Sequence, residues 1–164
     1  MNGYATAGWE SFFVAEVGGA AALTGLIFVA VSINLTKILA YVQLPRRAAE
    51  ALVMLTSVLA IASLALVPGQ SRVLLGLEIT AVALLAWIYP IVLQRRDARL
   101  PENKLDWVVK RALTHQIATL PLLVAGLSVL AGAGGGLYWL VPGTLLSFAG
   151  ALFNAWVLLV EILR

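Results

Sequence analysis

The feature that most constrains this chain is a stretch of 49 residues, from Ala112 to Val160, that contains no Lys, Arg, Asp or Glu. A water-soluble fold of this size has no core large enough to hide so much uncharged chain. A lipid bilayer can surround it, because the backbone groups of a helix satisfy one another without water. The sequence therefore predicts an all-α integral membrane protein, a helical bundle that crosses the bilayer several times.

Composition agrees with this class. Of the 164 residues, 62% are hydrophobic and only 12% are charged, which fits one helical bundle without a separate soluble domain. The chain has no cysteine, so disulfides, thiolate metal sites and cysteine nucleophiles are excluded. The net charge of +3 is interpreted as a signal of membrane orientation and not of nucleic-acid binding.

Five membrane-spanning helices are predicted within a single transmembrane domain, residues 1–164. Pro68-Gly69 ends the second of them, and the glycine-rich run 132–136 separates the fourth from the fifth. The loop 94–111 has two open interpretations, a surface helix in its second half or a solvated basic loop. The predicted spans cover about residues 17–40, 51–67, 73–93, 112–131 and 137–163.

Basic residues predict the orientation of the bundle. With five crossings, 10 of the 11 Lys and Arg residues lie on one side of the membrane, and only Arg72 lies on the other. Cytoplasmic loops carry such an excess of basic residues. We therefore expect the N-terminus outside and the C-terminus in the cytoplasm.

Two predicted spans carry a face of small and polar residues at helical spacing. Such faces let helices pack closely, which is their commoner role, or they line a narrow polar pathway. The face of the fifth span comprises Gly143, Ser147, Gly150, Asn154 and Glu161, and that of the first comprises Gly18, Ala22, Gly25, Ser32 and Thr36.

Acidic residues gather at the predicted outer side. Glu78 lies inside the third span, where an isolated charge is costly, and Arg72 is its expected partner. Glu10 and Glu16 are expected to share this outer acidic face. The face is interpreted either as a structural ion pair with two solvated acids or as a vestibule that attracts cations.

Polar residues of four spans lie at comparable depth near the predicted inner side, and we expect several of them to converge. Glu50 is expected to form an ion pair with Arg46 or Arg47, one helical turn away. His115 is the only histidine, and a lone histidine is more often a hydrogen-bonded structural group than a ligand. The polar residues at this depth are Asn34, Lys37, Glu50, His115, Gln116, Asn154 and Glu161.

Residues of both sides make up the candidates for a pathway or for helix packing, which are Ser32, Asn34, Glu78, His115, Ser147, Asn154 and Glu161. Pro90 and Pro121 are expected to kink their helices and release backbone carbonyls.

Signatures of enzymes are missing from the sequence. One histidine and scattered carboxylates do not supply a recognised zinc or di-iron ligand set. No P-loop, nucleophile elbow or dinucleotide-binding motif is present. We therefore expect no catalytic residues, no metal and no cofactor.

Three segments carry a resemblance to known proteins: Gly25–Asn34 (GLIFVAVSIN), Arg47–Leu52 (RAAEAL) and Leu66–Gln70 (LVPGQ). In these segments, which fall within roughly residues 25–70, the chain resembles a family of small uncharacterised bacterial multi-spanning integral membrane proteins. The resemblance implies a multi-pass protein of the bacterial inner (plasma) membrane and no established activity.

Two functions of different classes remain open. The first is a homo-oligomeric, channel-like pathway for an ion or small solute, since five helices alone do not readily enclose a pore. The second is a non-catalytic accessory or regulatory subunit of a larger membrane complex, in which the small-residue faces are docking faces. The expected partners are the lipid bilayer, further copies of the chain or other membrane subunits, and no nucleic acid.

Overall fold

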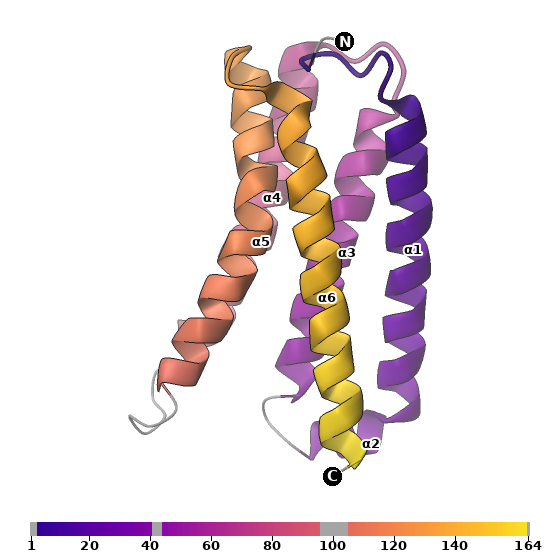
Figure 1. Cartoon of the computed structure of the whole chain (residues 1–164), viewed down its shortest axis with the longest axis vertical. Helices are drawn as coiled ribbons and strands as arrows, with labels where there is room; N and C mark the ends of the chain where they lie inside the picture. The colour runs from indigo at the N-terminus through magenta and orange to yellow at the C-terminus, as the bar shows by residue number, and fades with distance from the viewer. Residues whose placement is uncertain (1–2, 41–43, 96–104, 164) are drawn as a thin grey trace.

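The structure is a computed structural model that describes residues 3–40, 44–95 and 105–163, and all regular elements in these ranges are helices. Five long helices run along the long axis of the molecule (Figure 1). In chain order the elements are α1 (Glu10–Ile33), α2 (Leu35–Leu39), α3 (Leu44–Ala65), α4 (Arg72–Arg95), α5 (Leu105–Ala131), the 3-10 helix η2 (Gly136–Trp139) and α6 (Leu140–Leu163).

Four segments among the described residues are long and apolar enough to cross a membrane: Glu10–Ile33, Leu44–Ala65, Arg72–Val92 and Gly136–Leu158. The apolar part of α5, His115–Ala131, is shorter, although the whole helix has 27 residues and a length of about 40 Å. The prediction of an all-α protein is therefore confirmed, and four of its helical segments are long and apolar enough to span a membrane.

The bundle has two distinct ends, which we call upper and lower as they stand in Figure 1. The N-terminal segment and the turn between α5 and α6 lie at the upper end, whereas α3 begins and α6 ends at the lower end. The chain therefore starts and finishes at opposite ends of the molecule.

Helix α3 is the centre of the bundle, since it packs against α1, α4 and α6. Helix α5 packs against α4 and α6 and completes the bundle. The apolar core of the upper half takes large buried side chains from each of these helices, namely Phe13, Ile61, Ile79, Leu122 and Leu140. In a bilayer, where lipid is as apolar as these side chains, close packing rather than the hydrophobic effect would hold them together.

Helices α4 and α5 approach each other on small residues. A Cβ atom at Gly126 of α5 would lie 2.7 Å from the backbone N of Thr80. One at Gly76 of α4 would lie 2.9 Å from the backbone N of Leu130. Such backbone proximity is possible only without a side chain, so these two glycines set the spacing of α4 and α5.

The predicted break in the glycine-rich run is confirmed, because α5 ends at Ala131 and η2 begins at Gly136. Gly134 and Gly135 have φ angles of 85° and 106°, which L side chains rarely adopt. The N-terminal segment is attached to this turn, since Leu137 N donates to the carbonyl oxygen of Gly3 at 2.6 Å. Trp9 packs edge-on against Tyr138, with ring centroids 5.0 Å apart.

The helices extend beyond the predicted spans. Helix α1 begins at Glu10 instead of about residue 17, and it ends at Ile33, with Asn34 separating it from α2. Helix α3 begins at Leu44 instead of about residue 51. The physical reason is that charged residues end an uncharged run without ending a helix. In α1, the acid Glu10 in the first turn also stabilises the helix. Helix α5 begins at Leu105, so the helical interpretation of the loop 94–111 is confirmed from that residue onwards.

Candidate functional site

The polar face of α6 points into the bundle. Thr144, Ser147 and Asn154 are buried, and Ser147 is 0% exposed. Neighbouring helices come close where this face carries glycine: a Cβ at Gly143 would lie 3.0 Å from Leu122 Cγ of α5, and one at Gly150 would lie 3.0 Å from Met54 Sδ of α3. The described part of this face therefore lies against helices of the same chain.

Glu16 of α1 lies beside the upper part of this face. Its side chain is only 9% exposed. The Thr144 hydroxyl lies 3.3 Å from Glu16 Oε1, but also 3.1 Å from the carbonyl oxygen of Val141. A hydroxyl has a single proton, so it cannot fully satisfy both acceptors. Among the described residues, Glu16 Oε2 has no hydrogen-bond partner, and neither does Ser147 Oγ, one turn further along α6.

Glu16 is buried and is not exposed beside Glu10, as an outer acidic face with solvated acids would require. Glu10 is exposed and accepts a hydrogen bond from Gly8 N at 2.8 Å. Because α1 begins at Glu10, Glu16 lies in its second turn, on the side that Phe13 and Ala20 bury against the bundle. The spacing of 4, 3 and 4 residues in Trp9, Phe13, Glu16 and Ala20 is the sequence signal of this buried face.

Three further polar side chains occupy one layer in the lower half of the bundle. Gly150 lies against Met54 of α3 and Ala118 of α5. Since α6 runs opposite to α3 and α5 (Figure 1), the residues one turn below these three are Glu50, His115 and Asn154. Their side chains are 1%, 2% and 9% exposed. Part of the expected inner cluster thus comes together inside the bundle.

The other expected members of that cluster lie elsewhere or outside the described part. Asn34 donates to its own helix, with Nδ2 3.1 Å from the carbonyl oxygen of Ala30. Lys37 is exposed on α2. Glu161 lies where the structure describes the helix but not the side chain.

His115 and Gln116 of α5 bind backbone carbonyls of α4. His115 Nε2 lies 3.1 Å from the oxygen of Ala86, and Gln116 Nε2 donates to the oxygen of Trp87 at 3.3 Å. Pro90 lies four residues after Ala86 and has no N–H, so the helix itself cannot satisfy the Ala86 carbonyl. Because a carbonyl only accepts, Nε2 of His115 carries the proton in this bond.

An apolar layer separates the upper and lower polar groups. Its members are Met54, Ala118 and Gly150. Met54 and Ala118 belong to one buried apolar cluster, and Gly150 lies against both of them. Above it lie Ser147, Thr144 and Glu16, and below it lie Asn154, His115 and Glu50. The inward face of α6 is therefore a line of polar groups interrupted by one turn of packed apolar contacts.

Glu78 does not bind Arg72, its expected partner. The Glu78 Oε2 atom accepts a hydrogen bond from Gln70 Nε2 at 2.6 Å. The Arg72 guanidinium instead passes directly over Gly132, at the end of α5. The sequence holds no signal for Gln70, because its position depends on the path of the turn between α3 and α4.

The small-residue face of α1 points away from the bundle. Gly18, Ala22, Gly25 and Ser32 of α1 are all exposed, and so is Thr36 of α2. A Cβ at Gly18 or Gly25 would have no neighbour within 4 Å. The Ser32 hydroxyl donates to its own helix, at 2.8 Å from the oxygen of Phe28. This face has no partner among the described residues, in contrast to the face of α6.

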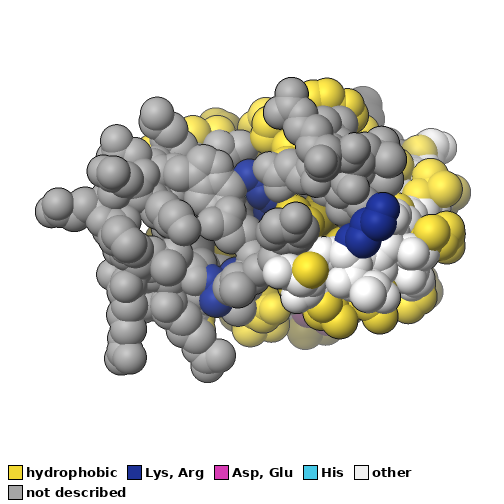
Figure 2. Space-filling model, turned by 90° about the horizontal axis from the view of Figure 1, so that it is seen from below, with side chains coloured by type: hydrophobic (Ala, Val, Ile, Leu, Met, Phe, Trp, Pro, Cys, Tyr) yellow, Lys and Arg dark blue, Asp and Glu magenta, His cyan; other side chains and the backbone are white. Residues whose placement is uncertain are grey.

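The lower end of the bundle carries basic side chains, which appear dark blue in Figure 2. Those described in this part of the chain are Lys37, Arg46 and Arg47, and Arg47 is 7% exposed. Arg47 and Glu50 are both buried on α3. Ion pairing of Glu50 with Arg46 or Arg47 stays a prediction.

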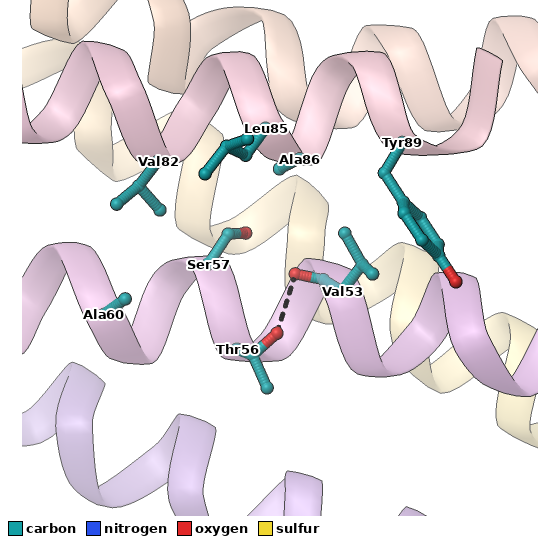
Figure 3. Close-up of a pocket in the computed structure, with 8 residues that line it drawn as sticks. All are labelled: Val53, Thr56, Ser57, Ala60, Val82, Leu85, Ala86 and Tyr89. Carbon is teal, nitrogen blue, oxygen red and sulfur yellow. Dashed lines mark hydrogen bonds between the residues drawn. The ribbon is translucent and has the colours of Figure 1, made fainter. Parts of the chain in front are cut away.

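A furrow of about 340 Å³ lies between α3 and α4 (Figure 3). Most of its lining is aliphatic, with Val53 and Ala60 from α3 and Val82 and Leu85 from α4. The Thr56 and Ser57 hydroxyls in it donate to carbonyls of their own helix, at 2.7 and 2.8 Å. The furrow therefore offers an apolar shape and few polar ligands.

The described residues contain no group of three or more His, Cys, Asp and Glu side chains that could hold a metal ion. Comparison with known proteins gave no match to a family model, to a curated protein or to a solved structure. The function must therefore be argued from the buried polar groups themselves. Thr144, which sequence reasoning did not single out, is one of them; its spacing of three residues from Ser147 is the signal for it.

Proposed function

We propose that this protein is a homo-oligomeric, channel-like pathway for an ion or small solute in the inner membrane of a bacterium. In this proposal five helices cross the bilayer, the upper end of the bundle faces outside, and the lower end faces the cytoplasm. Each protomer carries its own route along the inward face of α6, past Thr144, Ser147 and Asn154. The layer of Met54, Ala118 and Gly150 closes this route in the present conformation.

The observation that carries the proposal is the line of buried polar groups on α6, with Glu16 beside its upper part and Glu50 and His115 level with its lower part. Burying a polar group without a hydrogen bond costs roughly 1–3 kcal/mol in a protein interior. Ser147 Oγ and Glu16 Oε2 both carry this cost. Helix packing alone gives no reason to keep buried polar atoms without hydrogen bonds. A route for a polar solute gives one, because the passing solute or its water supplies the missing bonds.

Flux into liposomes that contain the purified protein tests the proposal. We expect flux of small cations above that of protein-free liposomes, and a decrease of about tenfold in Asn154→Leu, the equivalent of ~1.4 kcal/mol in the barrier. Met54→Ala shortens the side chain that closes the route and is expected to raise the flux. Thr56→Ala is the matched control, since that hydroxyl of α3 is exposed and bonded to its own helix. No flux by wild type and Met54→Ala alike would contradict the proposal.

Association of protomers is assigned to the exposed face of α1. Gly18 and Gly25 leave its surface open, and close helix packing in membranes uses such faces. We expect the wild type to form one defined oligomer in mild detergent and Gly25→Leu to shift it towards monomer without loss of helix content. Native mass spectrometry gives the subunit number of both.

The same face favours a second candidate, the accessory subunit of a larger complex. In that case the partner on α1 is a different membrane protein. The outcome that distinguishes the two is simple: a monomer that co-purifies with a second membrane protein, and loses it in Gly25→Leu, supports the accessory role and contradicts the homo-oligomer.

A further inference from the structure

We propose that Glu16, together with the hydroxyls of Thr144 and Ser147, is a binding site for one monovalent cation, either an alkali metal ion or a proton. The site lies inside the bundle between α1 and α6, above the apolar layer. The inference rests on the proposed function and deepens it, because it names the class of ion that enters the pathway from the upper end.

The first step of the argument concerns charge. Glu16 is nine-tenths buried, and an ionised carboxylate in such a place must be compensated. Helix α1 packs against α2, α3 and α6. Between Ala51 and Ala65 of α3, and between Leu140 and Leu158 of α6, the sequence contains no charged or titratable side chain.

The basic residues of the elements around α1 lie too far away to compensate Glu16. Lys37 of α2 and Arg46 and Arg47 of α3 are at the lower end of the bundle, whereas Glu16 lies in the second turn from the upper end. On α1 itself, the other titratable group is Glu10, which is exposed and acidic. The described basic residue of the upper end, Arg72 of α4, lies over Gly132 at the end of α5, and neither α4 nor α5 is among the helices that α1 packs against. None of these basic side chains is therefore in a position to neutralise Glu16, and we assign that role to a mobile cation.

The second step concerns the ligands. Glu16 Oε2 is buried and accepts no hydrogen bond among the described residues, and Ser147 Oγ is equally buried and without a partner there. Both flank Thr144, whose hydroxyl oxygen is 3.3 Å from Glu16 Oε1. A bound alkali ion or its water would take up both orphan oxygens. A proton on the carboxyl group would supply a donor in the same place.

The third step concerns the valence of the ion. The site offers one carboxylate and two neutral hydroxyls. Calcium takes six to eight oxygen ligands, commonly with several carboxylates, and magnesium demands a near-ideal octahedron. A single negative charge with hydroxyl ligands matches a single positive charge, which is why the inference names a monovalent cation.

Infrared difference spectroscopy of the purified full-length protein tests the inference without any flux measurement. One arm replaces choline chloride by sodium chloride, and then by potassium chloride, at constant pH. The other arm changes the pH in choline chloride alone. We expect a carboxyl band that changes in at least one arm, that is lost in Glu16→Gln and that is kept in Glu10→Gln, the matched control.

A response to sodium or potassium identifies an alkali ion, and a response to pH alone identifies a proton. If the ion is an alkali metal, Ser147→Ala is expected to raise its half-saturating concentration about tenfold, because one oxygen ligand is lost. If the ion is a proton, Ser147→Ala is expected to move the midpoint of the pH titration instead. Ser147→Ala also covers the case in which Glu16→Gln does not fold. It removes only one buried hydroxyl and keeps Glu16, so the carboxyl band can still be followed.

The inference would be overturned if the wild type and Glu16→Gln gave the same difference spectrum in both arms. The proposed function fails separately. Cation binding at Glu16 in a protein that gives no liposome flux would contradict the pathway and leave the site intact. Flux that persists in Glu16→Gln, with no spectral response in the wild type, would contradict the site and leave the pathway intact.

Discussion

At the scale of single residues, Pro90 explains the position of the only histidine. The proline removes the N–H that the carbonyl oxygen of Ala86 would accept within α4. His115 Nε2, 3.1 Å away on α5, supplies the replacement donor. A buried carbonyl left without a donor costs about 1–3 kcal/mol, so the pair of residues stabilises the α4–α5 contact together. This is the structural role that is more common for a lone histidine.

This coupling yields a double-mutant prediction. His115→Ala is expected to lower the free energy of unfolding by about 1–3 kcal/mol, because the Ala86 carbonyl stays buried without a donor. In a Pro90→Ala background the new N–H satisfies that carbonyl, so the same substitution is expected to cost clearly less. Unfolding in mixed detergent micelles, followed by circular dichroism, measures both. Equal costs in the two backgrounds would show that His115 does not replace the missing N–H.

At the scale of whole helices, the two small-residue faces show what periodicity predicts and what it does not. The faces of α1 and α6 are alike in sequence, and both were predicted with their members at the right spacing. Gly143 and Gly150 of α6 lie against other helices, whereas Gly18 and Gly25 of α1 have no neighbour. Periodicity defines a face, because it depends on one helix alone. The partner of that face depends on all the other helices.

Glu16 illustrates a second limit. The uncharged run of the first predicted span begins after Glu16, so the run alone leaves this acid outside the span. The helix begins at Glu10 and takes the acid inside. By contrast, the glycine-rich break before η2 was predictable, because a run of glycines is unfavourable in a helix and favourable at φ > 0. Local backbone preference was readable from the sequence, and burial of one charged residue was not.

Glycines at helix contacts give a prediction for α4 and α5. A Cβ at Gly126 would lie 2.7 Å from the backbone N of Thr80 and 2.9 Å from its Cα, and backbone atoms cannot move aside alone. Gly126→Ala is therefore expected to push α4 and α5 apart and to cost about 1–3 kcal/mol of unfolding free energy.

Gly19→Ala is the matched control for Gly126→Ala. A Cβ at Gly19 would lie 3.7 Å from Phe148 Cζ, an ordinary van der Waals contact, so the protein is expected to keep its stability or gain up to about 1 kcal/mol from the better helix propensity of alanine. Thermal unfolding in one detergent compares both variants with the wild type. A larger loss for Gly19→Ala than for Gly126→Ala would contradict the observed spacing of α4 and α5.

At the scale of the whole molecule, the described helices place the start and finish of the chain at opposite ends (Figure 1). The described basic side chains of the lower end are Lys37, Arg46 and Arg47, and that of the upper end is Arg72. The helices thus place most of the described basic residues at one end of the bundle. By the positive-inside rule, the end with the excess of basic residues faces the cytoplasm. The proposed topology, five crossings with the lower end in the cytoplasm, rests on this separation.

The absence of cysteine makes this topology directly testable. Single cysteines can be introduced at exposed positions: Ala7 and Val67 at the upper end, and Thr36 at the lower end. We expect a membrane-impermeant maleimide to label Ala7→Cys and Val67→Cys in intact cells. Thr36→Cys is expected to react only after the membrane is permeabilised. The reason is that the proposed topology keeps the lower end, with Lys37, Arg46 and Arg47, in the cytoplasm. Labelling of Thr36→Cys together with Ala7→Cys in intact cells would mean that α1 does not cross the membrane. Labelling of Thr36→Cys alone would invert the orientation and move the Glu16 site to the cytoplasmic half of the bilayer.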